Sequence, residues 1–394
     1  MSRKAFGSGY FGEWIEDEFG LPAYRYTCKQ QSDPKASPPT ERGLWRPPME
    51  HLHQVGNDRF VGVASNFGHI RLRQDEGSPK FLNDFDPTTH QYGGGFGYLT
   101  DGSTVLSTYY SEDEHFFDRI FGIGYYRKTV KGDGLSVDQT VFAPYGDDPL
   151  LITQVTIIND RNETVDLKWI EHWGCQQYQF SFKALMRSVV SKEHPSYYRR
   201  RLSKRFKHDI QVVGDNRGLL DKFRFKGLPI SDRVSWSIFN FALRSGVGKK
   251  LTGGPVKSPV SEAVLEDFSP PSVFLVSLDA SFDNYGTDAT AFFGEGGATS
   301  PDGLQKPLSG DIANKDVEVG LFLERKLTLQ PGESKTIYFA YGYLPDCFDL
   351  EELIRKYEGD LPNLLSKSCE KWRKRRIQLK LDDDEWVDRE LTWH

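Results

Sequence analysis

The 394-residue sequence has little cysteine and little methionine. It contains four cysteines and three methionines, and no two cysteines are spaced as a C-x-x-C pair. This spacing does not support zinc-binding or redox motifs, so the sequence predicts no metal site. So few cysteines in so long a chain are also typical of a reducing compartment.

The sequence also lacks a strong net charge and long apolar runs. The net charge is −6, whereas nucleic-acid-binding proteins usually carry a basic excess. One basic run, "RRRLSKRFKHD" from Arg199, is interpreted as a solvated loop because charge runs are usually solvated faces. No run approaches about 18 apolar residues, and the N-terminus has no apolar signal region. We therefore expect a cytoplasmic protein that binds neither nucleic acid nor membrane.

Aromatic residues and turn formers are plentiful. Aromatics make up 13% of the chain, with 37 glycines and 21 prolines, which favours β-structure over helix bundles. Strand-like runs follow one another from about residue 54, and "KGDG" (131–134) supplies the residues that a hairpin turn prefers. Residues 149–174 alternate in polarity on both sides of the polar turn "NDRNE", which predicts two long antiparallel strands. A second strand pair is predicted at 317–327 and 335–344.

The pattern becomes helical near the C-terminus. Asp349 is expected to cap a helix that stops at Gly359. The last stretch, "DDDEWVDRELTWH", predicts the start of another helix. The predicted units are a β-domain at 1–345 with an irregular excursion at about 185–260, a helical linker at 346–381, and the start of a further domain at 382–394.

The stretch "IEHWGCQQYQFSF" (170–182) combines aromatic rings with amides at the end of a predicted strand. Rings stack on the apolar faces of sugars and amides bind their hydroxyls, although the same rings are equally typical of a core. The candidate carbohydrate-binding residues are Trp173, Gln177, Tyr178 and Gln179. Paired carboxylates would cleave glycosides, but the sequence does not show which two face each other, so no catalytic residue is assigned.

Two further motifs are weak. The glycine-rich "YGGGFGY" (92–98) lacks the G-K-[ST] of a phosphate-binding loop, so a tight turn is the favoured interpretation. In "EHLH" (50–53), His51 and His53 share one strand face, but a metal site needs further ligands.

Four stretches together resemble the N-terminal region of the cellobiose phosphorylase-type enzymes, glycoside hydrolase family 94. They are "GYFGEWIEDEFGLPAYRYT", "VDQTVFAPYGDDPLLITQVTIINDRNETVDLKWIEHW", "SFDNYGTDATAFFGEGGATSPDGLQKPLSG" and "LTLQPGESKTIYFAYGYLPD". They span almost the whole chain in the family's order.

This resemblance implies a large antiparallel β-supersandwich of the galactose-mutarotase type, a short helical linker and then an (α/α)₆ barrel. The barrel of the family carries the general acid and the phosphate site, and inorganic phosphate is the co-substrate, with no other cofactor. A sandwich loop can reach the active site of the partner subunit in a homodimer through an aromatic-Gln-Arg-Asn run. Tyr178 and Gln179 match this run, but Phe180 stands where the Arg is expected.

The function expected from the resemblance is the sandwich portion of a carbohydrate-active enzyme that acts on β-gluco-oligosaccharides. It would be inactive without a barrel in cis or on a separate chain. A stand-alone carbohydrate-binding or subunit-assembly module is the first alternative. The second is a mutarotase-like epimerase that uses a Glu and a His as base and acid.

Helices after residue 346 should pack on the sandwich, and Trp386 and Trp393 should lie in an exposed apolar patch.

Overall fold

The structure is a computed structural model. It describes residues 11–27, 50–74, 80–110, 115–175, 178–179, 206–225, 271–312, 317–345, 348–379 and 385–393.

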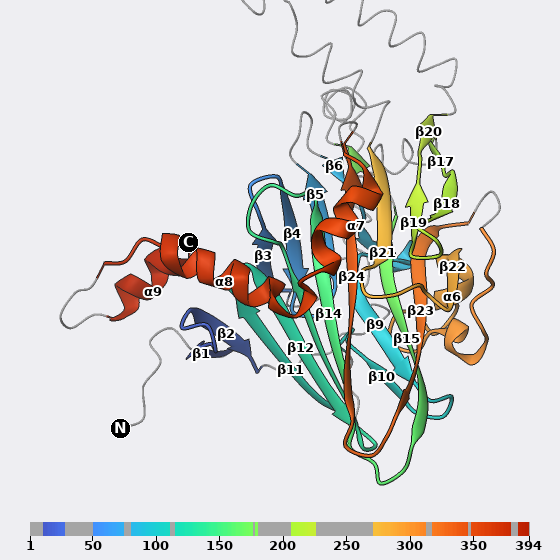
Figure 1. The fold of residues 1–394 in the computed structure, drawn as a ribbon, viewed down its shortest axis with the longest axis horizontal. Helices are drawn as coiled ribbons and strands as arrows, with labels where there is room; N and C mark the ends of the chain where they lie inside the picture. Colours follow the sequence, from blue (N-terminus) through green and yellow to red (C-terminus); the bar gives the residue numbers. More distant parts are fainter. Residues whose placement is uncertain are drawn as a thin grey trace, which may run out of the picture.

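The body consists of antiparallel sheets, as Figure 1 shows. The largest has ten strands, in the order β1 (Gly12–Glu16), β2 (Pro22–Tyr26), β11 (Phe116–Gly122), β12 (Tyr125–Gly132), β13 (Leu135–Phe142), β14 (Leu150–Asn159), β24 (Ser334–Leu344), β21 (Ser272–Ser277), β19 (Gly218–Asp221) and β18 (Ile210–Val213). A five-stranded sheet has the order β10 (Val105–Ser107), β9 (Gly94–Thr100), β15 (Val165–Gly174), β23 (Val319–Leu329) and β22 (Asn284–Asp288).

Smaller sheets and a few helices complete the described fold. A second five-stranded sheet has the order β16 (Tyr178–Gln179), β6 (Lys80–Phe81), β5 (Ile70–Gln74), β4 (Phe60–Ser65) and β3 (Leu52–Gly56). Two-stranded ribbons pair β17 (Phe206–Lys207) with β20 (Arg224–Phe225) and β7 (Phe85–Asp86) with β8 (Gln91–Tyr92). The helices are η2 (Pro87–Thr89), α6 (Ala289–Phe293), η3 (Asp302–Gln305), α7 (Leu350–Glu358), η4 (Leu361–Asn363), α8 (Leu364–Arg375) and α9 (Glu385–Trp393).

The predicted fold class, mainly β with large antiparallel sheets, is confirmed. The described part of the predicted excursion, residues 206–225, contains strands β17–β20, and β18 and β19 extend the ten-stranded sheet. None of the described helices is both long and apolar enough to cross a membrane.

The two predicted strand pairs form strands, but the strands of each pair do not bond to one another. β14 pairs with β13 and β24, whereas β15 pairs with β9 and β23 in the other sheet. β23 and β24 are likewise divided between the two sheets. The prediction of direct pairing was therefore wrong for 149–174, and the "NDRNE" turn is a crossing between sheets. Alternation shows that one face of a strand is buried, but not which strand lies beside it.

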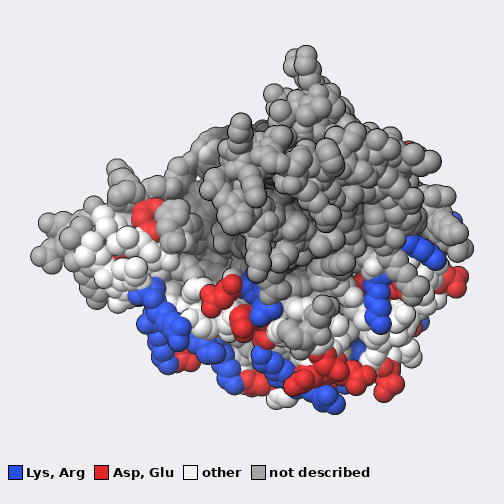
Figure 2. All heavy atoms as spheres, turned by 90° about the horizontal axis from the view of Figure 1, so that it is seen from above, with Lys and Arg blue, Asp and Glu red and all other residues white. Residues whose placement is uncertain are grey.

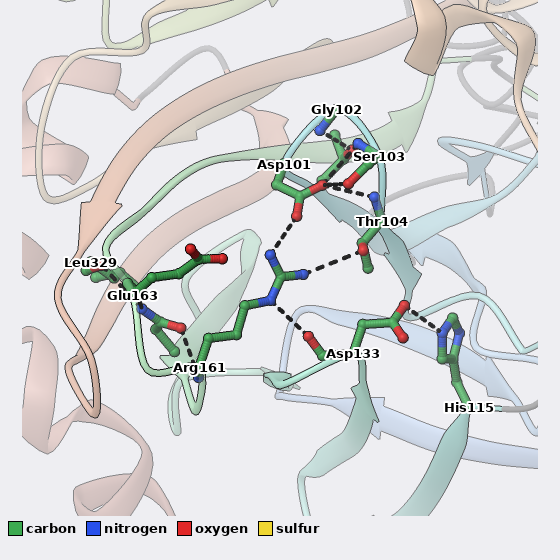
Figure 3. A network of polar contacts seen from close by, with 11 residues as sticks. Asp101, Gly102, Ser103, Thr104, His115, Asp133, Arg161, Glu163 and Leu329 are labelled. Atoms are coloured by element: carbon green, nitrogen blue, oxygen red, sulfur yellow. Dashed lines mark hydrogen bonds and ion pairs between the residues drawn. The ribbon is translucent and has the colours of Figure 1, made fainter.

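The crossing turn is fixed by its own polar side chains. Asn159 is fully buried, and its amide donates to the carbonyl oxygens of Glu163 at 2.8 Å and Leu329 at 3.1 Å. Arg161 donates to Asp101 Oδ2 at 2.8 Å and to the Asp133 carbonyl at 2.7 Å (Figure 3). The turns after β9, β12 and β14 are thus joined at one end of the sandwich.

The β12–β13 hairpin confirms the sequence prediction for "KGDG". Gly132 pairs with Leu135, so Asp133 and Gly134 form a two-residue turn. Their φ angles are +51° and +72°, the left-handed conformations that a type I′ turn requires.

Helices cover the outer faces of the two main sheets. Leu353, Ile354 and Tyr357 of α7 are buried against Phe274 and Tyr338 of the ten-stranded sheet. This confirms the predicted packing of the linker helices. Asp349 caps α7 as predicted, since its carboxylate accepts from the amides of Glu351 and Glu352.

The outer face of β15 and β23 is covered by α6 and η3, which the sequence analysis did not predict. The covering cluster includes Phe292, Phe293 and Leu304, which pack with Ile170 and Phe322. A five-residue helix is too short to show a clear helical period.

One substitution tests the close packing at β9. A Cβ atom on Gly97 would lie 2.3 Å from the Trp169 ring and 2.5 Å from the Ile170 carbonyl oxygen. We expect Gly97→Ala to lower the free energy of unfolding by about 3 kcal/mol, the upper range of overpacking. The measurement is urea unfolding followed by circular dichroism.

Gly359→Ala is the matched control. Nothing lies within 4 Å of a Cβ at Gly359, and its φ of −75° suits alanine. This variant should be neutral or gain up to about 1 kcal/mol. Equal stability of the two variants would contradict the packing described at Gly97.

Candidate functional site

The structure places Trp173, the first predicted sugar-binding residue, in the core. Its side chain is fully buried and its ring stacks on Tyr341 with centroids 4.3 Å apart. It therefore offers no ring face to a sugar, and this assignment is corrected: the ring belongs to the core, the alternative that the sequence had left open.

The other predicted sugar-binding residues are less informative. Tyr178 and Gln179 form β16, where they pair with Phe81 and Lys80. Gln177 lies outside the described residues. Sugar binding by these three residues stays a prediction.

A buried carboxylate, Glu171, is the polar centre between the two main sheets. Trp169 Nε1 donates to it at 3.1 Å and Trp173 Nε1 at 3.0 Å. Gln139 of the ten-stranded sheet donates at 3.2 Å and in turn accepts from Thr108 at 2.7 Å. Alternate residues of a strand point to the same face. The sequence of β15 therefore places the two donors, Trp169 and Trp173, on the same face as the acceptor, Glu171.

Lys128 is the cation that accompanies Glu171. Its ammonium is fully buried and donates to the carbonyl oxygens of Gly68 at 2.9 Å and Gly95 at 2.5 Å. Burial raises the pKa of Glu171, and the attraction of Lys128 offsets part of that rise. Burial lowers the pKa of Lys128, and Glu171 offsets part of that fall. With no exposed surface, this pair is a structural element of the core.

His172 lies on the opposite face of β15 from Glu171. It is 1% exposed and stacks on Phe322 at 4.6 Å between centroids, and burial lowers its pKa to about 3. Adjacent strand residues point to opposite faces. Glu171 and His172 therefore cannot act together as base and acid on one sugar, which argues against the mutarotase-like alternative at this place.

The candidate site is instead a cleft of about 790 Å³ between strands and the C-terminal helices. The β1–β2 hairpin, β3, the β11–β12 turn, α8 and α9 supply its walls. Its aromatic lining consists of Phe11, Trp14, Tyr24, Tyr26, His51, His53, Phe121, Trp372 and Trp393. Figure 1 shows α8 and α9 on the same side of the body as β1 and β2.

Ring contacts attach α9 to this cleft. Trp393 meets Trp14 edge to face at 4.9 Å and lies 4.9 Å from His53, measured between ring centroids. The guanidinium of Arg389 lies 4.6 Å from the centre of the Trp14 ring, a cation–π contact. Trp393 is accordingly half-buried.

The two histidines of "EHLH" have other partners in the cleft wall. His51 Nδ1 lies 2.9 Å from the Tyr26 hydroxyl, and His53 Nε2 lies 2.8 Å from the Gly122 carbonyl oxygen. Because a carbonyl oxygen only accepts, His53 Nε2 carries the hydrogen in this bond. Burial lowers the pKa of His53 to about 4. The pair is built into the wall as neutral hydrogen-bonding rings.

Aliphatic side chains remain exposed around the cleft. Leu52, Ile377 and Leu391 are 51%, 71% and 41% exposed, and all three line it. The predicted exposed apolar patch is therefore made by these aliphatic residues, whereas Trp393 packs on Trp14 and His53 and the Trp386 side chain lies outside the described part of the structure. The polar lining includes Gln54, Asp58 and Arg375. Flat rings beside amide and charged groups suit a sugar, whereas exposed leucine and isoleucine suit a protein surface.

One protein-family model matches part of the chain. Residues 260–360 match the family model described as glycosyl hydrolase 94, supersandwich domain. This match covers about a quarter of the 394 residues. The match includes described strands β21–β24 and helix α7. No curated protein matches the chain.

Three solved structures resemble the chain at low identity. A putative kojibiose phosphorylase from the human microbiome is 9% identical, covering 97% of this chain and 41% of that one, with a TM-score of 0.45. A polysaccharide lyase is 12% identical, covering 78% and 34%, with a TM-score of 0.37. A putative aldose 1-epimerase from Escherichia coli K12 is 8% identical, covering 75% and 100%, with a TM-score of 0.31. This chain thus spans 41% and 34% of the length of the first two.

The Glu171–Lys128 pair predicts a double-mutant result. Glu171→Gln or Lys128→Met leaves the other charge buried without its counter-charge, so each should lower the free energy of unfolding by about 3–5 kcal/mol. The double variant removes both charges and should lose less than the two single losses added together. Urea unfolding of all four proteins measures this coupling. Additive losses would show that the two charges do not stabilise each other.

Proposed function

We propose that this chain is the non-catalytic sandwich portion of a glycoside phosphorylase- or hydrolase-like enzyme that acts on β-gluco-oligosaccharides. The observation that carries the proposal is the supersandwich family match at residues 260–360. Catalysis would then belong to an (α/α)₆ barrel, in cis or on a separate chain, with inorganic phosphate as co-substrate. The same resemblance extends the proposal to a homodimer, and the few cysteines of the sequence extend it to a cytoplasmic location.

The composition of the cleft supports a non-catalytic role. Glycoside cleavage ordinarily uses two carboxyl groups on opposite sides of the bond. Of the described residues that line the cleft, Asp58 is the one carboxylate. Glu171 has no exposed surface, so no second acid reaches a bound sugar from this part of the core.

The exposed aliphatic rim supports packing against a helical domain. Ile377 follows α8 and Leu391 lies on α9, so both belong to the segment that would lead into a barrel. Exposed apolar surface of this kind usually marks a protein contact.

The proposal includes no nucleic-acid partner. Figure 2 shows Lys and Arg side chains interspersed with Asp and Glu over the described part of one face. Recognition of a phosphate backbone calls for a stripe of basic residues instead.

An activity assay tests the non-catalytic role. The purified chain, incubated with cello-, laminari- and sophoro-oligosaccharides with and without inorganic phosphate, should release neither sugar 1-phosphate nor reducing sugar. Both products are measured by enzyme-coupled detection and by chromatography, with an active glycoside phosphorylase as positive control. Product formation by this chain alone would show that it contains an active site of its own and would overturn the proposal.

A second candidate function, a carbohydrate-binding module, is favoured by the aromatic lining of the cleft. Trp14 is partly exposed even though Trp393 and Arg389 contact its ring. Gln54 and Arg375 line the same cleft. Small-molecule binding pockets are commonly lined by aromatic side chains together with a few polar groups that orient the ligand.

Calorimetric titration with the same oligosaccharides tests this second function. If the cleft binds them, Trp14→Ala should weaken affinity about fivefold, since an aromatic contact contributes about 1 kcal/mol. Phe116→Ala is the control, because Phe116 is 57% exposed but does not line the cleft. Absence of binding by the unmodified chain would remove the second function and leave the first intact.

A further inference from the structure

A second polar cluster lies away from the cleft, at the end of β15. Cys175 directly follows this strand, His208 lies between β17 and β18, and Asp221 ends β19. The three residues come from two segments of the described chain, and they meet where the five-stranded sheet adjoins the edge of the ten-stranded sheet.

The three side chains converge on one point. Cys175 Sγ donates to Asp221 Oδ2 at 3.2 Å, and His208 Nδ1 lies 2.5 Å from the same oxygen. One ligand atom from each residue lies within 4.8 Å of the others. The amide of Asp209 donates to the other carboxylate oxygen, Asp221 Oδ1, at 3.0 Å, which holds the carboxylate in this orientation.

We propose that Cys175, His208 and Asp221 form a binding site for a Zn²⁺ ion. A thiolate, an imidazole and a carboxylate are ligands that Zn²⁺ takes in tetrahedral sites. Donors about 2.0–2.3 Å from a zinc ion stand roughly 3.5 Å apart in a tetrahedron. The 3.2 Å between Cys175 Sγ and Asp221 Oδ2 is close to this value. The 2.5 Å between His208 Nδ1 and the same oxygen would have to increase by about 1 Å when the ion replaces the proton of that hydrogen bond.

The surroundings select a transition metal over calcium or magnesium. Those two ions prefer oxygen ligands alone, whereas this cluster holds one sulfur and one nitrogen donor. Cys175 and Asp221 are fully buried, while the His208 side chain is 27% exposed. An ion would therefore enter from the side of the histidine, where a water molecule would complete the tetrahedron.

The site would cross-link the two main sheets. The Tyr341 hydroxyl of β24 donates to the Gly174 carbonyl at 2.8 Å, which fixes the chain next to Cys175. Asp221 is held by its pairing with Val273 of β21. Cys175 thus directly follows one strand and Asp221 ends another, and ion binding would connect both of them to His208. This inference does not depend on the proposed function.

Cobalt binding by the full chain tests the site. Metal-free protein titrated with Co²⁺ should show an ultraviolet thiolate-to-cobalt charge-transfer band and intense visible bands, saturating at one ion per chain. Zn²⁺ should displace the cobalt and should also raise the melting temperature, because it binds the folded state. A folded chain that gives no such spectrum and no zinc-dependent shift overturns the proposal.

Variants assign the ligands. Cys175→Ser should abolish the charge-transfer band, and His208→Gln should weaken Zn²⁺ affinity by roughly tenfold or more. Cys369→Ser is the matched control, since Cys369 is the other described buried cysteine and lies on α8 in an apolar cluster. Because His208 is partly exposed, its variant keeps the test usable if Cys175→Ser fails to fold. Retention of the charge-transfer band in Cys175→Ser, or its loss in Cys369→Ser, would contradict the assignment.

Discussion

The sandwich depends on a buried carboxylate that both sheets must satisfy. Glu171 accepts hydrogen bonds from two tryptophans of its own strand and from Gln139 of the opposite sheet. Its counter-charge, Lys128, is held by backbone carbonyls. An uncompensated charge in this position would cost several kcal/mol, so the spacing and register of the two sheets are constrained by polar contacts as well as by apolar packing. Trp169 and Trp173 therefore fill the apolar core with their rings and also donate hydrogen bonds to Glu171.

The ends of the sandwich are constrained differently. Where the chain passes from β14 to β15 it changes sheets, and Asn159 and Arg161 supply the hydrogen bonds that the turning backbone and its neighbours need. The opposite end of β15 carries the Cys175 cluster. The same strand therefore contributes to the crossing turn, the buried acid and the proposed zinc site, and its outer face is sealed by α6 and η3.

The aromatic cleft connects this rigid body to the C-terminal helices. Trp14 and His53 belong to strands, and Trp393 comes from α9. Rings from distant segments meet there beside exposed aliphatic side chains. Under the proposed function, the sandwich positions these helices for a catalytic domain. Among the described residues of the cleft there is one carboxylate, so the chemistry would take place elsewhere. The zinc site, in contrast, would act on the stability of the sandwich alone.

The sequence by itself determined the local structure. Period-two alternation located the long strands, "KGDG" specified a type I′ turn, and Asp349 marked the start of α7, because each depends on neighbouring residues. Only the tertiary structure decided which strands pair, since alternation at 149–174 is equally compatible with a hairpin and with a crossing between sheets. It also decided that Trp173 is core, and it brought Cys175 to His208 and Asp221, which stand 33 and 46 positions further along the chain. Spacing motifs cannot detect ligands that meet only through sheet packing, because their distance in space is fixed by strand order and not by their distance in sequence.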